Sequence, residues 1–83
     1  MRKDWHEKAW NDYLYWQTQD KKTIKKINSL IQTIERGERT GQAEMLKGGL
    51  AGWMRARIDQ TNCLIYKTEG NVLQILSCRG HYS

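Results

Sequence analysis

The sequence predicts an α+β fold in which an N-terminal helical hairpin packs on one face of a mostly antiparallel β-sheet. Three observations support this class. Residues 1–36 carry apolar side chains at helical spacing, residues 54–83 contain runs typical of strands, and turn motifs separate those runs. A chain of 83 residues has the size of one small domain, so we expect a single domain over residues 1–83.

Two helices joined by a tight turn are expected first. Residues 7–19 have a helical pattern, and its aromatic-rich apolar stripe is predicted to be core. The stripe consists of Trp10, Tyr13, Leu14 and Trp16. Asp20 is a suitable N-cap for a second helix over residues 21–36, and Gly37 suits the position just beyond its end. The apolar residues of that helix share one face: Ile24, Ile27, Leu30, Ile31 and Ile34.

The rest of the chain is predicted to form strands and turns. Residues 1–5 are a candidate edge strand, and residues 43–47 are a candidate short strand. Alternation and turn residues then predict three longer strands and two turns. These strands are expected at residues 53–58, 63–67 and 72–78, with the turns at 59–62 and 69–71.

The strand at residues 53–58 alternates strictly, which gives the sheet two different faces. Arg55 and Arg57 share one face, and Met54, Ala56 and Ile58 share the other. We expect the apolar face to lie against the helices. The arginine face, which Cys63 could join, is then expected to look toward solvent or substrate.

The charge of the chain favours a polyanionic partner. Fourteen Lys and Arg against nine Asp and Glu give a net charge of +5. Nucleic acid, an acidic protein and a membrane surface all fit that balance, and charge alone does not choose among them. No apolar run is long enough to span a membrane and the N-terminus lacks an apolar signal segment, so we expect a soluble cytoplasmic protein. Cys63 and Cys78 have no metal-site spacing and are expected to be buried free thiols rather than a disulfide.

The end of the chain combines three kinds of side chain that suit RNA chemistry. Arg79 is a phosphate-binding cation, His81 carries an imidazole suited to proton transfer, and Tyr82 offers a ring for base stacking. The alternative is a solvated tail whose composition is accidental.

Further residues extend the same chemistry. Glu44 and Lys47 precede the strand that carries Arg55 and Arg57. RNA is cleaved when its 2′-OH attacks the adjacent phosphorus, which needs a base, a cation for the phosphate charge and an acid for the leaving oxygen. We see no metal-ligand cluster, and this chemistry needs no metal or cofactor. Each residue alone also fits a solvated surface position.

Segments spread over nearly the whole chain resemble one family. They are residues 10–17, 20–31, 41–47, 57–58, 64–66 and 81–82. Together they resemble the YoeB/Txe toxins of bacterial toxin–antitoxin modules, within the RelE-like superfamily. The resemblance implies a RelE/YoeB-like microbial RNase fold and a metal-independent endoribonuclease that cuts mRNA on the ribosome. It also implies a cognate YefM/Axe-like antitoxin, operator DNA binding only through the antitoxin complex, and a possible homodimer.

The resemblance assigns roles to individual residues. Glu44 corresponds to the general base of the family and His81 to its general acid. Tyr82 corresponds to the adjacent terminal tyrosine, Arg57 to a phosphate-contacting strand arginine, and Lys47 to a lysine beside the site.

Cys63 departs from the family pattern, because it stands where a catalytic arginine is expected. A thiol cannot replace a guanidinium fork. The chain could therefore be an impaired toxin that binds antitoxin or ribosome, or an active enzyme in which Arg55 or Arg79 supplies the cation. A different substrate geometry and a generic basic RNA-binding domain are further alternatives. We expect Arg55 and Cys63 to face each other across two strands. The loop before Glu44 is also shorter than usual for the family, which leaves the placement of Glu44 open.

Overall fold

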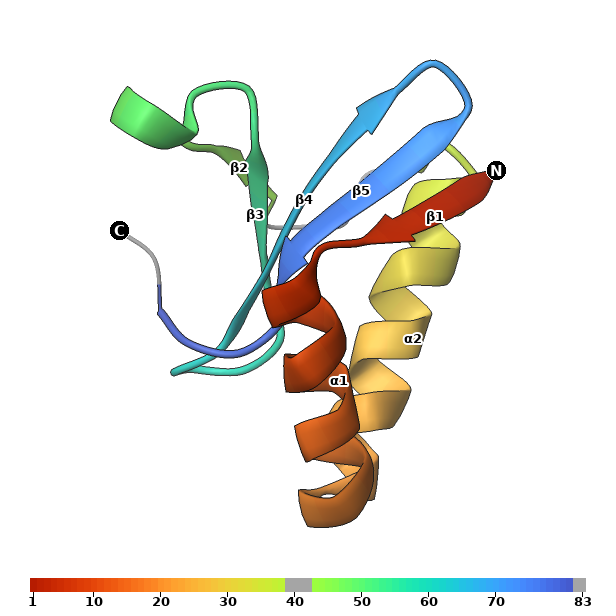
Figure 1. The fold of residues 1–83 in the computed structure, drawn as a ribbon, viewed down its shortest axis with the longest axis vertical. Helices are drawn as coiled ribbons and strands as arrows, with labels where there is room; N and C mark the ends of the chain where they lie inside the picture. The colour runs from red at the N-terminus through yellow and green to blue at the C-terminus, as the bar shows by residue number, and fades with distance from the viewer. Residues whose placement is uncertain (39–42, 82–83) are drawn as a thin grey trace.

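The computed structural model describes residues 1–38 and 43–81. In these residues two helices lie against a five-stranded sheet (Figure 1). The elements are β1 (Arg2–Trp5), α1 (Glu7–Gln19), α2 (Lys21–Glu35), β2 (Glu44–Met45), the 3₁₀ helix η1 (Gly48–Leu50), β3 (Met54–Arg57), β4 (Cys63–Glu69) and β5 (Val72–Ser77). The predicted α+β class and helical hairpin are confirmed. No helix in the described residues is both long and apolar enough to cross a membrane.

The predicted boundaries of α2 are nearly correct and have visible causes. The Asp20 carboxylate accepts hydrogen bonds from the backbone N–H groups of Lys22 and Thr23, so it caps the helix as expected. At the other end Gly37 has a φ of +74°. The N–H groups of Gly37 and Glu38 bond to carbonyls of the last turn, which is a Schellman motif.

The strand order is β1-β5-β4-β3-β2, and only the β1–β5 pairing is parallel. The mostly antiparallel sheet is therefore as predicted. β2 has two residues, shorter than expected, and β4 runs two residues beyond Lys67. Gly70 takes a positive φ in the β4–β5 turn, and no non-glycine residue in the described chain does.

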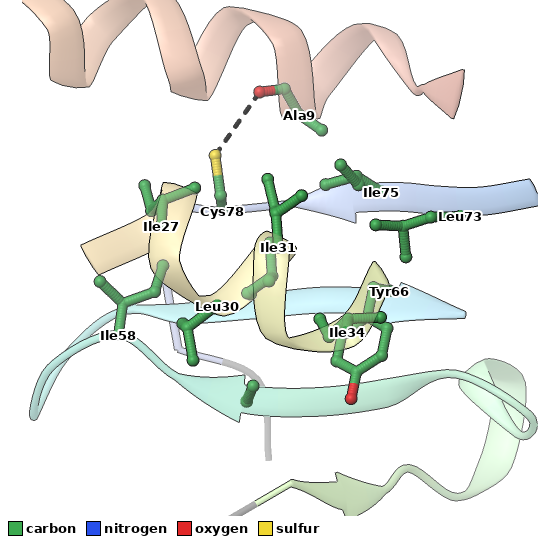
Figure 2. Close-up of a cluster of buried hydrophobic side chains, with 12 residues drawn as sticks. Ala9, Ile27, Leu30, Ile31, Ile34, Ile58, Tyr66, Leu73, Ile75 and Cys78 are labelled. Atoms are coloured by element: carbon green, nitrogen blue, oxygen red, sulfur yellow. Dashed lines mark hydrogen bonds between the residues drawn. The ribbon is translucent and has the colours of Figure 1, made fainter. Parts of the chain in front are cut away.

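The main core lies between the helices and one sheet face. Figure 2 shows four α2 side chains over the strands. The Cys78 thiol donates to the Ala9 carbonyl at 3.6 Å, the dashed line in that figure. The four α2 residues are Ile27, Leu30, Ile31 and Ile34. The prediction that the aromatic stripe of α1 belongs to the core is only partly correct, because Trp10 and Leu14 are more than 40% exposed.

A second apolar cluster occupies the other face of the sheet. Buried Leu46, Cys63 and Ile65 pack there with partly buried Leu50, Trp53 and Leu76. This face was expected to look toward solvent or substrate. That expectation is wrong at its centre, because the first four residues of β4 are all buried and the strand is covered on both sides. The arginines of β3 lie at the margin of this cluster.

Candidate active site

Glu44 and Arg55 form the first pair of the predicted site. They lie opposite each other in the β2–β3 ladder, and Arg55 Nη2 donates a 2.7 Å hydrogen bond to Glu44 Oε2. The Arg55 side chain is 15% exposed and the Glu44 side chain 59%. The short strand β2 therefore places an open carboxylate beside a guanidinium that lies against the protein.

Arg57 and Cys63 form the second pair. The β3–β4 register sets Arg57 directly opposite Cys63 and Arg55 opposite Ile65. The expectation that Arg55 faces Cys63 is therefore wrong, and the two are diagonal neighbours on one face. Arg57 is exposed, whereas Cys63 is 1% exposed and packs in the second apolar cluster with Leu46. The position of the expected arginine is thus filled by a buried thiol.

The chain end is fastened beside the same strand. The Gly80 carbonyl accepts a 3.0 Å bond from the Cys63 N–H, and the Gly80 N–H donates to Asn62 Oδ1 at 2.9 Å. In Figure 1 the trace after β5 turns past the β3–β4 connection and runs toward the side on which β2 lies. His81 is the next residue and is exposed. The backbone just before His81 is therefore held against Cys63, which lies opposite Arg57.

The remaining predicted site residues are placed differently. Arg79 lies over the Tyr15 ring of α1, with its guanidinium carbon 3.6 Å from the ring centroid. The structure thus brings Arg79 to α1 rather than to the Glu44–Arg55 pair. Lys47 is exposed and directly precedes η1. Tyr82 lies outside the described residues.

Comparison with known proteins identifies the family. Residues 5–82 match the family described as YoeB-like toxin of bacterial type II toxin-antitoxin system. A Toxin YoeB from Escherichia coli is 43% identical over 84 residues, which covers 99% of this chain and 100% of that relative. The chain belongs to the YoeB toxin family.

Solved structures give the same result for the fold of this YoeB-family chain. The YoeB/ParE toxin from Agrobacterium tumefaciens superposes with a TM-score of 0.93 at 35% identity, covering 99% of this chain and 100% of that one. A YoeB-YefM complex from Staphylococcus aureus contains a chain with a TM-score of 0.90 at 36% identity, covering 99% and 98%. The family resemblance predicted from the sequence is confirmed.

Sequence reasoning missed a group of residues that fastens the chain end of this YoeB-family protein to α1. Asp12, 7% exposed, accepts hydrogen bonds from Lys8, from the Ser77 hydroxyl and from the backbone N–H of Cys78. Lys8 and Asp12 have the i,i+4 spacing of an ordinary surface ion pair. No local signal showed that β5 would bury the carboxylate.

Two titrating groups near the site have shifted pKa values. Burial, and to a smaller extent the Asp12 carboxylate, raise the pKa of the Cys78 thiol to about 12, and Lys8 opposes the shift. Partial burial favours a higher pKa for Asp59, but hydrogen bonds from Thr61 and Asn62 outweigh it, so the pKa lies below its ordinary value. Cys78 is therefore a neutral thiol. Asp59 is a firmly ionised turn residue that holds Asn62, the partner of Gly80, at 2.7 Å through the Asn62 backbone N–H.

The geometry of the YoeB-family site suits phosphodiester chemistry. One sheet face carries an exposed carboxylate at Glu44 with two guanidinium groups at Arg55 and Arg57. Gly80 is bonded to the Cys63 backbone at the end of that face, and His81 is the next residue. A carboxylate and an imidazole can exchange protons with a substrate, and arginines can offset charge on phosphate oxygens.

Proposed function

We propose that this chain is a ribosome-dependent mRNA endoribonuclease that arrests translation and is neutralised by a cognate antitoxin. The single observation that carries the proposal is that, in a YoeB-family fold, Gly80 bonds to the backbone of Cys63 opposite Arg57. This contact joins Gly80 to the β3–β4 pair, which bears Arg55, and Arg55 is paired in turn with Glu44 of β2. The reaction would take place in the cytoplasm, on mRNA held by the ribosome.

In the proposed reaction Glu44 takes the proton of the 2′-OH as the 2′-oxygen attacks phosphorus. The bond from phosphorus to the 5′-oxygen breaks, and His81 gives a proton to that leaving oxygen. The products are a 2′,3′-cyclic phosphate and a free 5′-OH. Each proton transfer of this kind typically contributes about 10²–10⁴-fold. Arg57 would bind the non-bridging oxygens as their charge increases, and Tyr82 would stack on a neighbouring base.

Arg55 is the residue that we propose to replace the missing arginine. It lies diagonal to Cys63 on the same face, and its guanidinium contacts the proposed base. A bound phosphate could share this guanidinium with Glu44, because a guanidinium has five donors. Lys47, exposed next to η1, would add attraction for the RNA backbone. Arg79 lies on Tyr15 and is assigned no role in the chemistry.

The proposed partner of the free toxin is an antitoxin with an acidic segment. This chain has a net charge of +5, and a YoeB-family relative from Staphylococcus aureus is found in complex with YefM. An acidic chain that folds on docking would complement that charge and cover the arginine face. A gene next to this one that encodes a short protein with an acidic tail would support this partner.

A second function is favoured by one observation, the burial of Cys63. Its thiol is 1% exposed within the second apolar cluster, so it offers the substrate no charge. Losing a preorganised donor to a developing phosphate charge costs about 10²–10³-fold by analogy with oxyanion-hole donors. In this alternative the chain binds its antitoxin as co-repressor, or occupies the ribosome, without cutting RNA.

In-vitro translation followed by primer extension tests the first proposal. We expect the purified chain to produce new mRNA ends only when ribosomes translate. His81→Ala should lower the cleavage rate by about 10²–10⁴-fold and leave a measurable residual rate, with little change in melting temperature because His81 is exposed. Cutting of free RNA without ribosomes would contradict the ribosome dependence. A large fall in the melting temperature of His81→Ala would instead mean that the imidazole stabilises the fold.

A further inference from the structure

Asp12 is a buried carboxylate that the proposed mechanism does not use. Among the described residues the buried polar or charged ones are Asp12, Thr23 and Ser77. Two of these, Asp12 on α1 and Ser77 on β5, bond to each other at 3.2 Å. Burying a carboxylate is unfavourable unless hydrogen-bond donors surround it, so the residues around Asp12 must supply those donors.

Two of the donors around Asp12 come from Ser77 and Cys78, which lie shortly before His81 in the chain. Asp12 Oδ2 accepts from Lys8 Nζ at 2.8 Å, from Ser77 Oγ at 3.2 Å and from the Cys78 backbone N–H at 3.1 Å. A carboxylate oxygen that receives three donors is fully used, and satisfied buried networks hold one arrangement.

Lys8 extends this network along the chain. Its ammonium has three donors, and it bonds to Asp12, to Ser77 Oγ at 2.9 Å and to the Arg79 carbonyl at 3.0 Å. Trp16 Nε1 donates to the Cys78 carbonyl at 2.9 Å. Residues 77–79 are therefore fastened to α1 at each successive position.

The next residue is fastened to the sheet instead. Gly80 bonds through both its N–H and its carbonyl to Asn62 and Cys63, and its φ of +108° turns the chain there. The path from Ser77 to Gly80 is thus determined on both sides. His81 follows at once, so this path fixes the point from which the backbone of His81 starts.

We infer that Asp12 is a positioning residue, which acts through Lys8 and Ser77 to direct His81 at the scissile phosphodiester. The inference rests on the proposed function, since it assigns His81 the role of acid. Chain ends otherwise fray, and a misplacement of about 1 Å can reduce a rate by about 10²-fold. Asp12 itself touches no substrate.

Asp12→Asn tests the inference, because it keeps the size of the side chain and removes the charge that holds Lys8. The matched control is Asp20→Ala, which removes the capping carboxylate of α2, whose hydrogen bonds are to Lys22 and Thr23. In single-turnover cleavage on ribosomes we expect Asp12→Asn to lower the rate constant by about 10- to 100-fold with an unchanged half-saturating ribosome concentration. Equal losses in both variants, or a loss of affinity alone, would overturn the inference.

A double-mutant cycle separates positioning from general stability. If Asp12 acts through His81, Asp12→Asn should cause no further loss in a His81→Ala background. Multiplying losses would show that Asp12 acts on something else. Ser77→Ala serves as a second variant, since it removes one hydroxyl and keeps the carboxylate. It should produce a smaller loss of the same kind, and an unchanged rate constant would count against the network.

Backbone relaxation measured by NMR gives a readout that does not depend on activity. We expect the order parameters of the Gly80 and His81 amides to fall in Asp12→Asn and to stay at wild-type values in Asp20→Ala. If the wild-type chain does not cleave at all, the proposed function fails while this measurement still decides whether Asp12 orders the tail. Unchanged order parameters in Asp12→Asn would overturn the positioning role.

Discussion

At the scale of single residues, the sheet face combines charges that are open to solvent with a neutral group that is buried. Glu44 and Arg57 are exposed, whereas Cys63, opposite Arg57, is almost fully covered. Arg55 lies between these extremes, with a side chain 15% exposed and ion-paired to Glu44. In the reaction that we propose, cleavage therefore depends on how well Arg55 supplies the cation that the neutral Cys63 does not.

Cys63→Arg tests that question directly. If Arg55 already supplies the cation, the variant should gain less than about tenfold in ribosome-dependent cleavage, and Arg55→Gln should lose about 10²-fold or more. We also expect Cys63→Arg to lower the melting temperature, because a guanidinium would enter an apolar cluster. The measurements are primer extension and thermal unfolding.

Cys78→Ser is the matched control for Cys63→Arg, since Cys78 is the other buried thiol and packs in the main core. It should lose stability without a change in which mRNA sites are cut. If the wild-type chain does not cleave mRNA and Cys63→Arg does, the second proposed function holds: the chain is an impaired toxin that acts by binding.

At the scale of elements, residues 78–80, which follow β5, are held by hydrogen bonds to α1 and to Asn62 and Cys63. Gly80 has a φ of +108°, and a Cβ there would meet no atom within 4 Å. A substitution at this glycine would therefore act through backbone conformation and not through a clash. The hairpin glycine Gly70 has a φ of +57° and the same open surroundings, but it lies in the β4–β5 turn.

We expect Gly80→Ala and Gly70→Ala to lower stability by similar amounts, about 1–2 kcal/mol, because both place a side chain in left-handed backbone. Only Gly80→Ala should reduce cleavage, since only that residue directs His81. Chemical denaturation and the translation assay measure the two effects. Loss of cleavage in both variants would indicate that the assay follows stability and not the direction of the tail.

At the scale of the whole molecule, a small core and a net charge of +5 make acid conditions destabilising. A side-chain hydrogen bond from Thr23 lowers the pKa of Asp20, and hydrogen bonds at Asp59 lower its pKa despite partial burial. In each case the pKa in the folded state lies below the unfolded value. Stability from these groups is therefore present above the unfolded pKa and is lost as the pH falls through the folded pKa.

Melting temperature measured between about pH 2 and pH 6 checks this prediction. We expect stability to fall on acidification, and the double variant Asp20→Asn, Asp59→Asn to show a shallower fall than the wild type. Both groups are near the surface, so the difference should be modest. If the melting temperatures of the two proteins fall equally on acidification, other carboxylates are responsible for the loss of stability.

The sequence by itself determined the helices, the strand faces and the family. Helical spacing, the Asp20 cap and the strict alternation at residues 53–58 are local properties, and local properties can be seen without coordinates. The segments from residue 10 to residue 82 that resemble YoeB toxins predicted the family in the same way, and the match over residues 5–82 confirms it.

Tertiary structure alone decided the register, the second apolar cluster and the surroundings of the tail. The partner of Cys63 depends on how two strands align, and the burial of Asp12 depends on Ser77 of β5, which lies 65 positions away from it in the chain. The burial of the apolar run at residues 63–66 on both faces depends on Leu46 and its neighbours packing over the sheet. These contacts join distant parts of the chain, so no local pattern could contain them.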